Sequence, residues 1–256
     1  MLNIQAIPAF NDNYIWFIED TDTRHVVIVD PGDATPVIKA IEQQQLIPSA
    51  LLITHHHHDH IDGINQLVEL YDIPVYGPKI ATIPSVTHPL TANDTLIIDS
   101  TFPAITILDI SGHSAVHIAF LFENKLFCGD TLFGAGCGRL LGGTAEQLFH
   151  SLQKIAQLPT DTKVYCAHEY TQANLRFAQA VEPDNSDIQQ RILDTDTLRQ
   201  HGWPSLPSTL KLELATNPFL RCDQPTVIQA TEFFSGKYLS STIEVFTELR
   251  LWKDRF

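Results

Sequence analysis

The sequence has few basic residues and no long apolar run. Lysine and arginine number 16 against 30 aspartates and glutamates, so the net charge at pH 7 is −14 with histidine neutral. So acidic a chain repels the phosphates of nucleic acids and the headgroups of anionic membranes, and we expect neither as a partner. No apolar run approaches the roughly 18 residues of a membrane span, so we expect no transmembrane segment.

Paired cysteines and a basic leader are also missing. The four cysteines are widely spaced and form no C-x-x-C pair, which is typical of reduced, buried thiols. The first 20 residues contain three acidic residues and no lysine or arginine, so we expect no signal or transit peptide. Together these features predict a cytoplasmic protein, which we expect to be a monomer.

The composition is that of a globular protein with one or two domains. The 256 residues are 44% hydrophobic and 18% charged, which excludes general disorder. The first part of the chain alternates short β-rich runs with helical patterns at 35–45, 63–71 and 144–157, where Thr144 is a candidate N-cap. The expected strands are 2–7, 14–18, 26–30, 50–54, 73–77, 95–98, 105–110, 116–122, 126–129 and 163–166.

After residue 168 the strand patterns vanish. Helical patterns separated by proline-containing loops occupy 171–181, 186–200, 208–215, 224–234 and 240–252. A β-rich block followed by an all-helical block indicates an α+β fold with a helical appendage. We therefore predict a domain over 1–168 and a helical domain over 169–256.

Histidine is the unusual residue of this chain. Five of the 12 histidines lie within residues 55–60, after a strand-like run, in the order H-x-H-x-D-H. His55 and His57 are two residues apart, so in an extended segment they point the same way. Asp59 and His60 follow where the chain turns, so their side chains can face a second metal position. Imidazole and carboxylate together suit a divalent transition metal.

Further metal-ligand types stand at the ends of later predicted strands. His113 follows strand 105–110, Asp130 follows 126–129, and His168 follows 163–166. Each alone is a weak signal, but four strand ends that all deliver a ligand type are a strong one. Five histidines and two aspartates are an appropriate set for two metal ions.

These motifs make the chain resemble the metallo-β-lactamase superfamily and, within it, the glyoxalase II (hydroxyacylglutathione hydrolase) family. The resemblance spans the whole chain, including the helical tail. It rests on Asn11–Tyr14, Asp30–Gly32, Thr54–His60, Gly129–Phe133, Gly136–Arg139, Tyr165–Thr171, Asn217–Arg221 and Lys253–Phe256. It implies a four-layer αββα sandwich with a C-terminal α-helical domain.

The resemblance also implies how the ligands divide. His55, His57 and His113 would bind one metal, while Asp59, His60 and His168 would bind the other and Asp130 would bridge them. Zinc is the expected metal, and iron or manganese suits the same ligands. His56, His58 and His117 fall outside the set. His117 is either a support for a metal ligand or a packed strand residue, and we favour the second interpretation.

The reaction implied is hydrolysis of S-(2-hydroxyacyl)glutathione thioesters by a metal-bridging hydroxide that Asp59 and Asp130 orient. The typical substrate is S-D-lactoylglutathione, which yields D-lactate and glutathione in methylglyoxal degradation. The family's substrate-binding positions correspond to Arg139, Tyr170, Arg250 and Lys253. Leu141 and Gly142 depart from the aromatic and acidic residues common in the family.

Three other functions use parts of the same pattern. The first is another hydrolase of the superfamily, such as a β-lactamase, lactonase or nuclease, but these lack the tail that carries Arg250 and Lys253. The second is a persulfide dioxygenase with one iron, which the seven-residue ligand set disfavours. The third is a metal buffer, which needs no glutathione-type tail.

Overall fold

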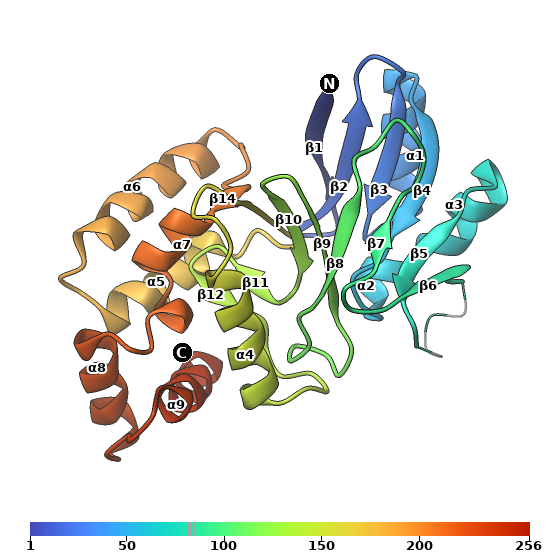
Figure 1. Ribbon diagram of the computed structural model, residues 1–256. Coiled ribbons are helices and arrows are strands. Elements are labelled where there is room, and N and C mark those ends of the chain that lie inside the picture. Colours follow the sequence, from blue (N-terminus) through green and yellow to red (C-terminus); the bar gives the residue numbers. More distant parts are fainter. Residues whose placement is uncertain (81–82, 84) are drawn as a thin grey trace. The chain divides into compact units, whose positions relative to one another are not determined.

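The chain forms two compact units in the computed structural model, which describes residues 1–80, 83 and 85–256 (Figure 1). Unit 1 comprises Met1–Asp109 and Val116–Gly129, and unit 2 comprises Ile110–Ala115 and Asp130–Phe256. These units are defined by how compactly their residues pack. The predicted domain boundary between residues 168 and 169 was based instead on the change from strand-like to helical sequence patterns, and it stays a prediction. Within the described residues, no helix has the length and apolarity that a membrane crossing requires.

A six-stranded sheet is the centre of unit 1. Its first three strands are antiparallel and its last four run parallel, with β3 common to both groups. In spatial order the strands are β1 (Leu2–Ala9), β2 (Asn13–Asp20), β3 (His25–Val29), β4 (Ile47–Leu52), β5 (Val75–Pro78) and β6 (His88–Leu90).

This sheet is buried on both faces. Two helices, α1 (Ala34–Gln44) and α3 (Ile64–Tyr71), pack their apolar sides onto one face, where Phe17 and Ile28 are fully buried. Because side chains alternate along a strand, Trp16 and Leu52 lie on the opposite face, and they are also buried, with 3% and 0% exposure. Because β3 and β4 are parallel neighbours in this sheet, they end side by side, and the residues that follow them are brought together.

Unit 1 also contains four antiparallel strands in the order β7-β8-β9-β10. They are β7 (Thr95–Leu96), β8 (Ile105–Asp109), β9 (Ile118–Phe122) and β10 (Lys125–Gly129). The last two form a hairpin, and Glu123 at its tip has a positive φ of 50°. The short helix α2 (His58–Ile61) completes the unit.

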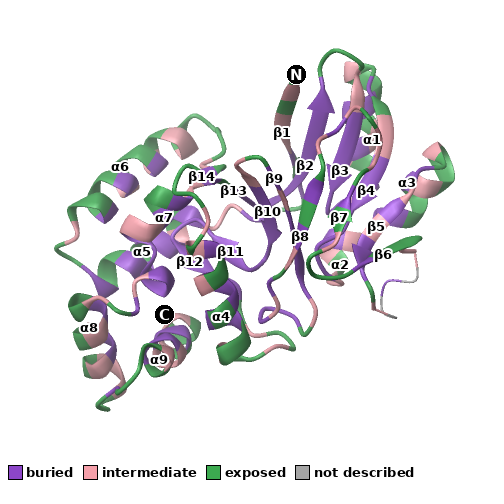
Figure 2. Ribbon diagram, viewed as in Figure 1, coloured by how far each residue is buried: buried purple, intermediate pink, exposed green. Residues whose placement is uncertain are grey.

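Unit 2 is mainly helical (Figure 2). Its strands are β11 (Leu132–Phe133), β12 (Gly136–Cys137), β13 (Lys163–Cys166) and β14 (Ser208–Thr209). Its helices are α4 (Ala145–Ala156), α5 (Thr171–Val181), α6 (Ser186–Gln200), α7 (Leu210–Thr216), the 3₁₀ turn η1 (Pro218–Leu220), α8 (Pro225–Ser235) and α9 (Thr242–Arg255). The aromatic rings of Phe177 and Phe246 both pack on Phe219, at centroid distances of 6.0 and 5.7 Å.

Most long elements agree with the sequence prediction. Helix α4 begins with the predicted cap, since Thr144 and Gln147 form a reciprocal capping box. The expectation that no strand follows residue 168 is wrong, because Ser208 and Thr209 pair with β13 and delay the start of α7 to Leu210. The short elements β6, β11, β12 and α2 were also not predicted.

Candidate active site

The ends of β3 and β4 place the first group of polar residues in unit 1. Asp30 follows β3, is 4% exposed, and has a positive φ of 51°. Its carboxylate accepts hydrogen bonds from the main-chain nitrogen of Thr54 at 2.8 Å and from the Thr54 hydroxyl at 2.7 Å. The same carboxylate lies 3.0 Å from Nδ1 of His60. Asp30 therefore holds the loop after β4 and orients the His60 ring.

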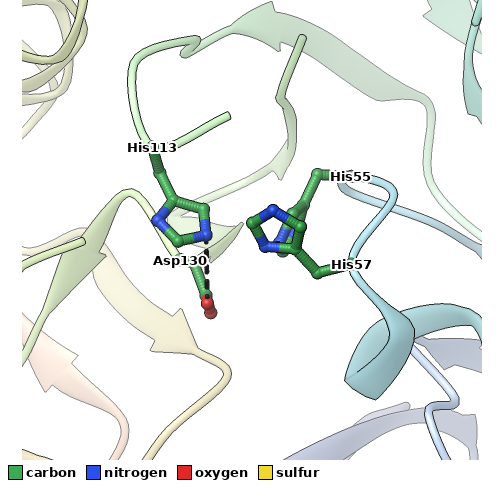
Figure 3. Close-up of side chains that lie close together, drawn as sticks. All are labelled: His55, His57, His113 and Asp130. Carbon is green, nitrogen blue, oxygen red and sulfur yellow. Dashed lines mark hydrogen bonds and ion pairs between the residues drawn. The ribbon is translucent and has the colours of Figure 1, made fainter. Parts of the chain in front are cut away.

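The rings of His55 and His57 lie against each other, which fits the prediction that the two side chains point the same way. Nε2 of His55 lies 3.0 Å from Nδ1 of His57, and both side chains appear in Figure 3. His55 is fully buried, and its Nδ1 lies 3.0 Å from the Thr54 hydroxyl. His117, just before β9, is also buried and stacks on the His55 ring at 4.5 Å with an interplanar angle of 15°.

Asp59 and His60 lie on α2 and have their side chains near each other. Oδ2 of Asp59 is 3.6 Å from Nε2 of His60. Asn13 donates a hydrogen bond from Nδ2 to the same carboxylate oxygen at 3.0 Å. Gly32 lies directly against the Asp59 main chain, where any Cβ would collide with the Asp59 carbonyl group. This close approach explains the glycine of the Asp30–Gly32 segment.

The remaining predicted ligands gather around Asp130 in unit 2. Oδ2 of Asp130 is 3.5 Å from Nε2 of His113 (Figure 3), and Oδ1 is 3.3 Å from Nε2 of His168. All three residues are buried, with exposures of 4–7%. One carboxylate therefore faces two imidazoles, each with a different oxygen.

The neighbouring loops fix these rings. Nδ1 of His113 lies 2.8 Å from the main-chain oxygen of Arg139, and the His113 oxygen accepts from the Leu141 nitrogen at 2.7 Å. Gly138 lies against both Asp130 and His113, with no room for a side chain. The ring of Tyr170 stacks on His168 at 4.8 Å and 5°.

The donor atoms fit divalent metal ions. When metal–ligand bonds of about 2.1 Å are arranged tetrahedrally, two ligand atoms of the same metal lie roughly 3.4 Å apart. The donor pairs within each unit are separated by 3.0–3.6 Å. The atoms are nitrogens of histidine and oxygens of aspartate, which is the ligand chemistry of zinc, iron and manganese.

Family models match almost the whole chain. The model of the metallo-beta-lactamase superfamily matches residues 10–168, and the model of the hydroxyacylglutathione hydrolase C-terminus matches residues 169–256. Two curated relatives named hydroxyacylglutathione hydrolase come from Nitrosomonas europaea and Aliivibrio fischeri. The chain is 49% and 50% identical to them over its full length, covering 97% and 100% of theirs. The chain belongs to the hydroxyacylglutathione hydrolase family of the metallo-β-lactamase superfamily.

Solved structures share the fold. BLEG-1 B3 metallo-beta-lactamase is 26% identical with a TM-score of 0.62, and the match covers 86% of this chain and 99% of that one. TTHA1623 in a di-iron-bound form is 25% identical with a TM-score of 0.60, covering 85% and 100%. The predicted fold class, an α+β metallo-β-lactamase sandwich with a helical C-terminal region, is thereby confirmed.

The family's cationic substrate positions lie close together in unit 2. Arg139 is exposed, with Nε 3.9 Å from Oδ1 of Asp254, and Arg250 donates to the same oxygen at 3.1 Å. Lys253 lies over the ring of Phe177 at 5.5 Å. Its pKa is lowered from 10.5, first by burial and then by the positive charges of neighbouring arginines, including Arg250 and Arg139.

Arg250 is enclosed, in contrast to the exposed Arg139. Its side chain is only 4% exposed and its guanidinium lies over the Phe219 ring at 4.9 Å. Burial raises the pKa of the neighbouring Cys137 thiol to about 11, in spite of Arg250. All four cysteines are free and buried, as predicted, and such a thiol is a poor nucleophile.

The sequence reasoning missed several supporting residues. Asn13 and Asp30 lie in the segments that carried the family resemblance but received no role there. Arg176 on α5 contributes to the positive field at Lys253, and Asp254 pairs with two of the cations. The aspartate at the end of a buried strand was an available signal for Asp30. Asp254 follows Arg250 by four residues, and this helical spacing was a signal too. The contacts of Asn13 and Arg176 depend on tertiary packing.

Proposed function

We propose that this chain hydrolyses S-(2-hydroxyacyl)glutathione thioesters, with S-D-lactoylglutathione as the typical substrate and D-lactate and glutathione as products. The observation that carries this proposal is the full-length match, at 49–50% identity, to relatives named hydroxyacylglutathione hydrolase. The match extends through the helical C-terminal segment, which the superfamily model does not cover. The role proposed is methylglyoxal degradation by a cytoplasmic monomer that uses neither nucleic acid nor membrane.

Two metal ions are part of this proposal. His55, His57 and His113 would hold one ion, Asp59, His60 and His168 the other, and Asp130 both. Zinc is our expected metal, and the structure of TTHA1623 in a di-iron-bound form, which shares the fold, supports iron as an alternative. When bound, such ions would lower the pKa of water to about 7, so that hydroxide is available as the nucleophile, and would polarise the thioester carbonyl.

The chain's own carboxylates orient the nucleophile in this scheme. Oδ2 of Asp59 already accepts a hydrogen bond from Asn13, which fixes the plane of the carboxylate. The two oxygens of Asp130 face different imidazoles, as a bridging role requires. The leaving group is a thiolate with a pKa near 8.5, so it departs without a strong general acid.

Recognition of the glutathione part is proposed for Arg139, Tyr170, Arg250 and Lys253. Glutathione carries two carboxylates, and in a chain of net charge −14 these cations form a local positive region that attracts them. The Tyr170 ring, stacked on His168, places a hydroxyl-bearing side chain beside a metal ligand. The half-buried Lys253 ammonium is less hydrated than an exposed one, which strengthens a charge-assisted hydrogen bond.

Steady-state kinetics on three substrates test the proposal. S-D-lactoylglutathione, the N-acetylcysteamine thioester of lactate and a chromogenic cephalosporin are compared with the same metal-loaded preparation. We expect kcat/KM for the glutathione thioester to exceed that of the truncated thioester at least 100-fold, with no β-lactam cleavage. Equal rates on both thioesters would overturn glutathione recognition. Turnover of the β-lactam alone would assign the chain to the other hydrolase class.

A further inference from the structure

Asn13 connects the first hairpin of unit 1 to the predicted metal ligand Asp59. It is the first residue of β2, pairs with Ala9 across the hairpin and is 7% exposed. Its Nδ2 donates to Oδ2 of Asp59 at 3.0 Å and lies 3.5 Å from the Asp59 main-chain oxygen. The two residues are 46 positions apart in the sequence, so this contact is purely tertiary.

The main chain of Asp59 is also held by residues other than Asn13. Gly32 packs against its carbonyl group, and the nitrogen of Gly63 donates to the Pro31 oxygen at 3.0 Å. These contacts place α2 but do not determine the side-chain rotamer of Asp59, which is 41% exposed. The hydrogen bond from Asn13 acts on the carboxylate itself.

We propose that Asn13 is the positioning residue for Asp59 as a metal ligand, an inference that rests on the ligand set of the proposed function. A carboxylate offers about four lone-pair sites, two on each oxygen, so Oδ2 can accept from Asn13 and still bind a cation through its second site. An amide donor adds no charge, whereas a lysine or arginine at this point would repel the metal. Hydrogen-bond partners of metal ligands typically contribute 10–100-fold to metal affinity.

Zinc binding to the metal-free full-length protein tests this role without relying on activity. Affinity is measured by competition with a chromophoric chelator. We expect Asn13→Ala to weaken one zinc equivalent 10–100-fold. Asn13→Leu, which keeps the branched shape and removes the donor, should give the same loss if Asn13→Ala folds poorly. Asn11→Ala, at an exposed position of the same hairpin, is the matched control and should bind zinc as the wild type does.

The double variant Asn13→Ala/Asp59→Ala separates a positioning role from a structural one. If Asn13 acts through Asp59, Asn13→Ala causes no additional loss of affinity once Asp59 is alanine. The role of Asn13 would be overturned if Asn13→Ala caused an equal loss of zinc affinity in both backgrounds. It would also be overturned if Asn13→Ala and Asn13→Leu kept wild-type zinc affinity while Asp59→Ala was weakened. Full zinc affinity of Asp59→Ala would instead overturn the ligand assignment of the proposed function.

Discussion

Arg250 donates a hydrogen bond from Nη1 to the main-chain oxygen of Cys137 at 3.1 Å, across 113 residues of sequence. The guanidinium also reaches Asp254, one turn further along α9, at 3.1 Å. It thus joins the last helix to β12, and Arg139 follows β12 by two residues. Arg250 both adds positive charge and fixes the loop that presents another cation.

Replacing Arg250 by methionine should therefore affect stability as well as substrate binding. Loss of the buried hydrogen bonds leaves the Cys137 carbonyl without this donor, which costs about 1–3 kcal/mol. We expect denaturant unfolding to show this decrease and KM for S-D-lactoylglutathione to rise. Arg255→Met, at the exposed end of α9, is the control. A raised KM with unchanged stability would instead make Arg250 a pure substrate contact.

Lys253 should give the proposed reaction an alkaline pH dependence. Because its pKa is lowered from 10.5, mainly by burial, the ammonium loses its proton at a lower pH than an ordinary lysine does. The cation that attracts the substrate is present below that pKa and is lost as pH rises through it. We expect KM to increase at a pH below 10.5. In Lys253→Arg, which stays charged, this rise should move to higher pH, and an unchanged profile would exclude Lys253 as its source.

Leu141 should limit substrate affinity. It is 54% exposed, and its nitrogen donates to the main-chain oxygen of the proposed ligand His113. A tyrosine here adds ring stacking and one neutral hydrogen bond, worth about 0.5–1.5 kcal/mol or up to about tenfold in KM. We expect Leu141→Tyr to lower KM with little change in kcat. A change in kcat alone would show that Leu141 does not line the glutathione site.

Asp130 should matter for both metals and His60 for one. The Asp130 carboxylate faces His113 with one oxygen and His168 with the other. Asp130→Ala should therefore lower metal content towards zero, whereas His60→Ala should lose about one equivalent. Elemental analysis of both variants decides this. Two metals retained in Asp130→Ala would rule out the bridge.

The elements that position the site were largely predictable because parallel strands end at one edge of a sheet. Asp30 and Thr54 follow the parallel strands β3 and β4 and meet there. Strands β8 and β10, which precede His113 and Asp130, run in the same direction because both pair antiparallel with β9. The two-residue strands β11, β12 and β14 were not predictable, since so few residues carry no periodicity. Their pairing is determined by the surrounding loops and helices.

The depth to which α9 is buried also could not be predicted from the sequence. Spacing of three residues places Arg250 and Lys253 on one helical face, but it does not say how deeply that face is buried. In the structure Arg250 lies over Phe219 and is almost fully enclosed, while Lys253 reaches the more open edge near Phe177. The hydrogen bond from Asn13 to Asp59 is invisible in the sequence for the same reason.

The most direct test of the account is a zinc titration of the metal-free protein in which bound metal and hydrolysis of S-D-lactoylglutathione are measured in the same samples. The account predicts that activity rises until two equivalents are bound and disappears again on chelation. Maximal activity at one equivalent, or no hydrolysis with two equivalents bound, would contradict it.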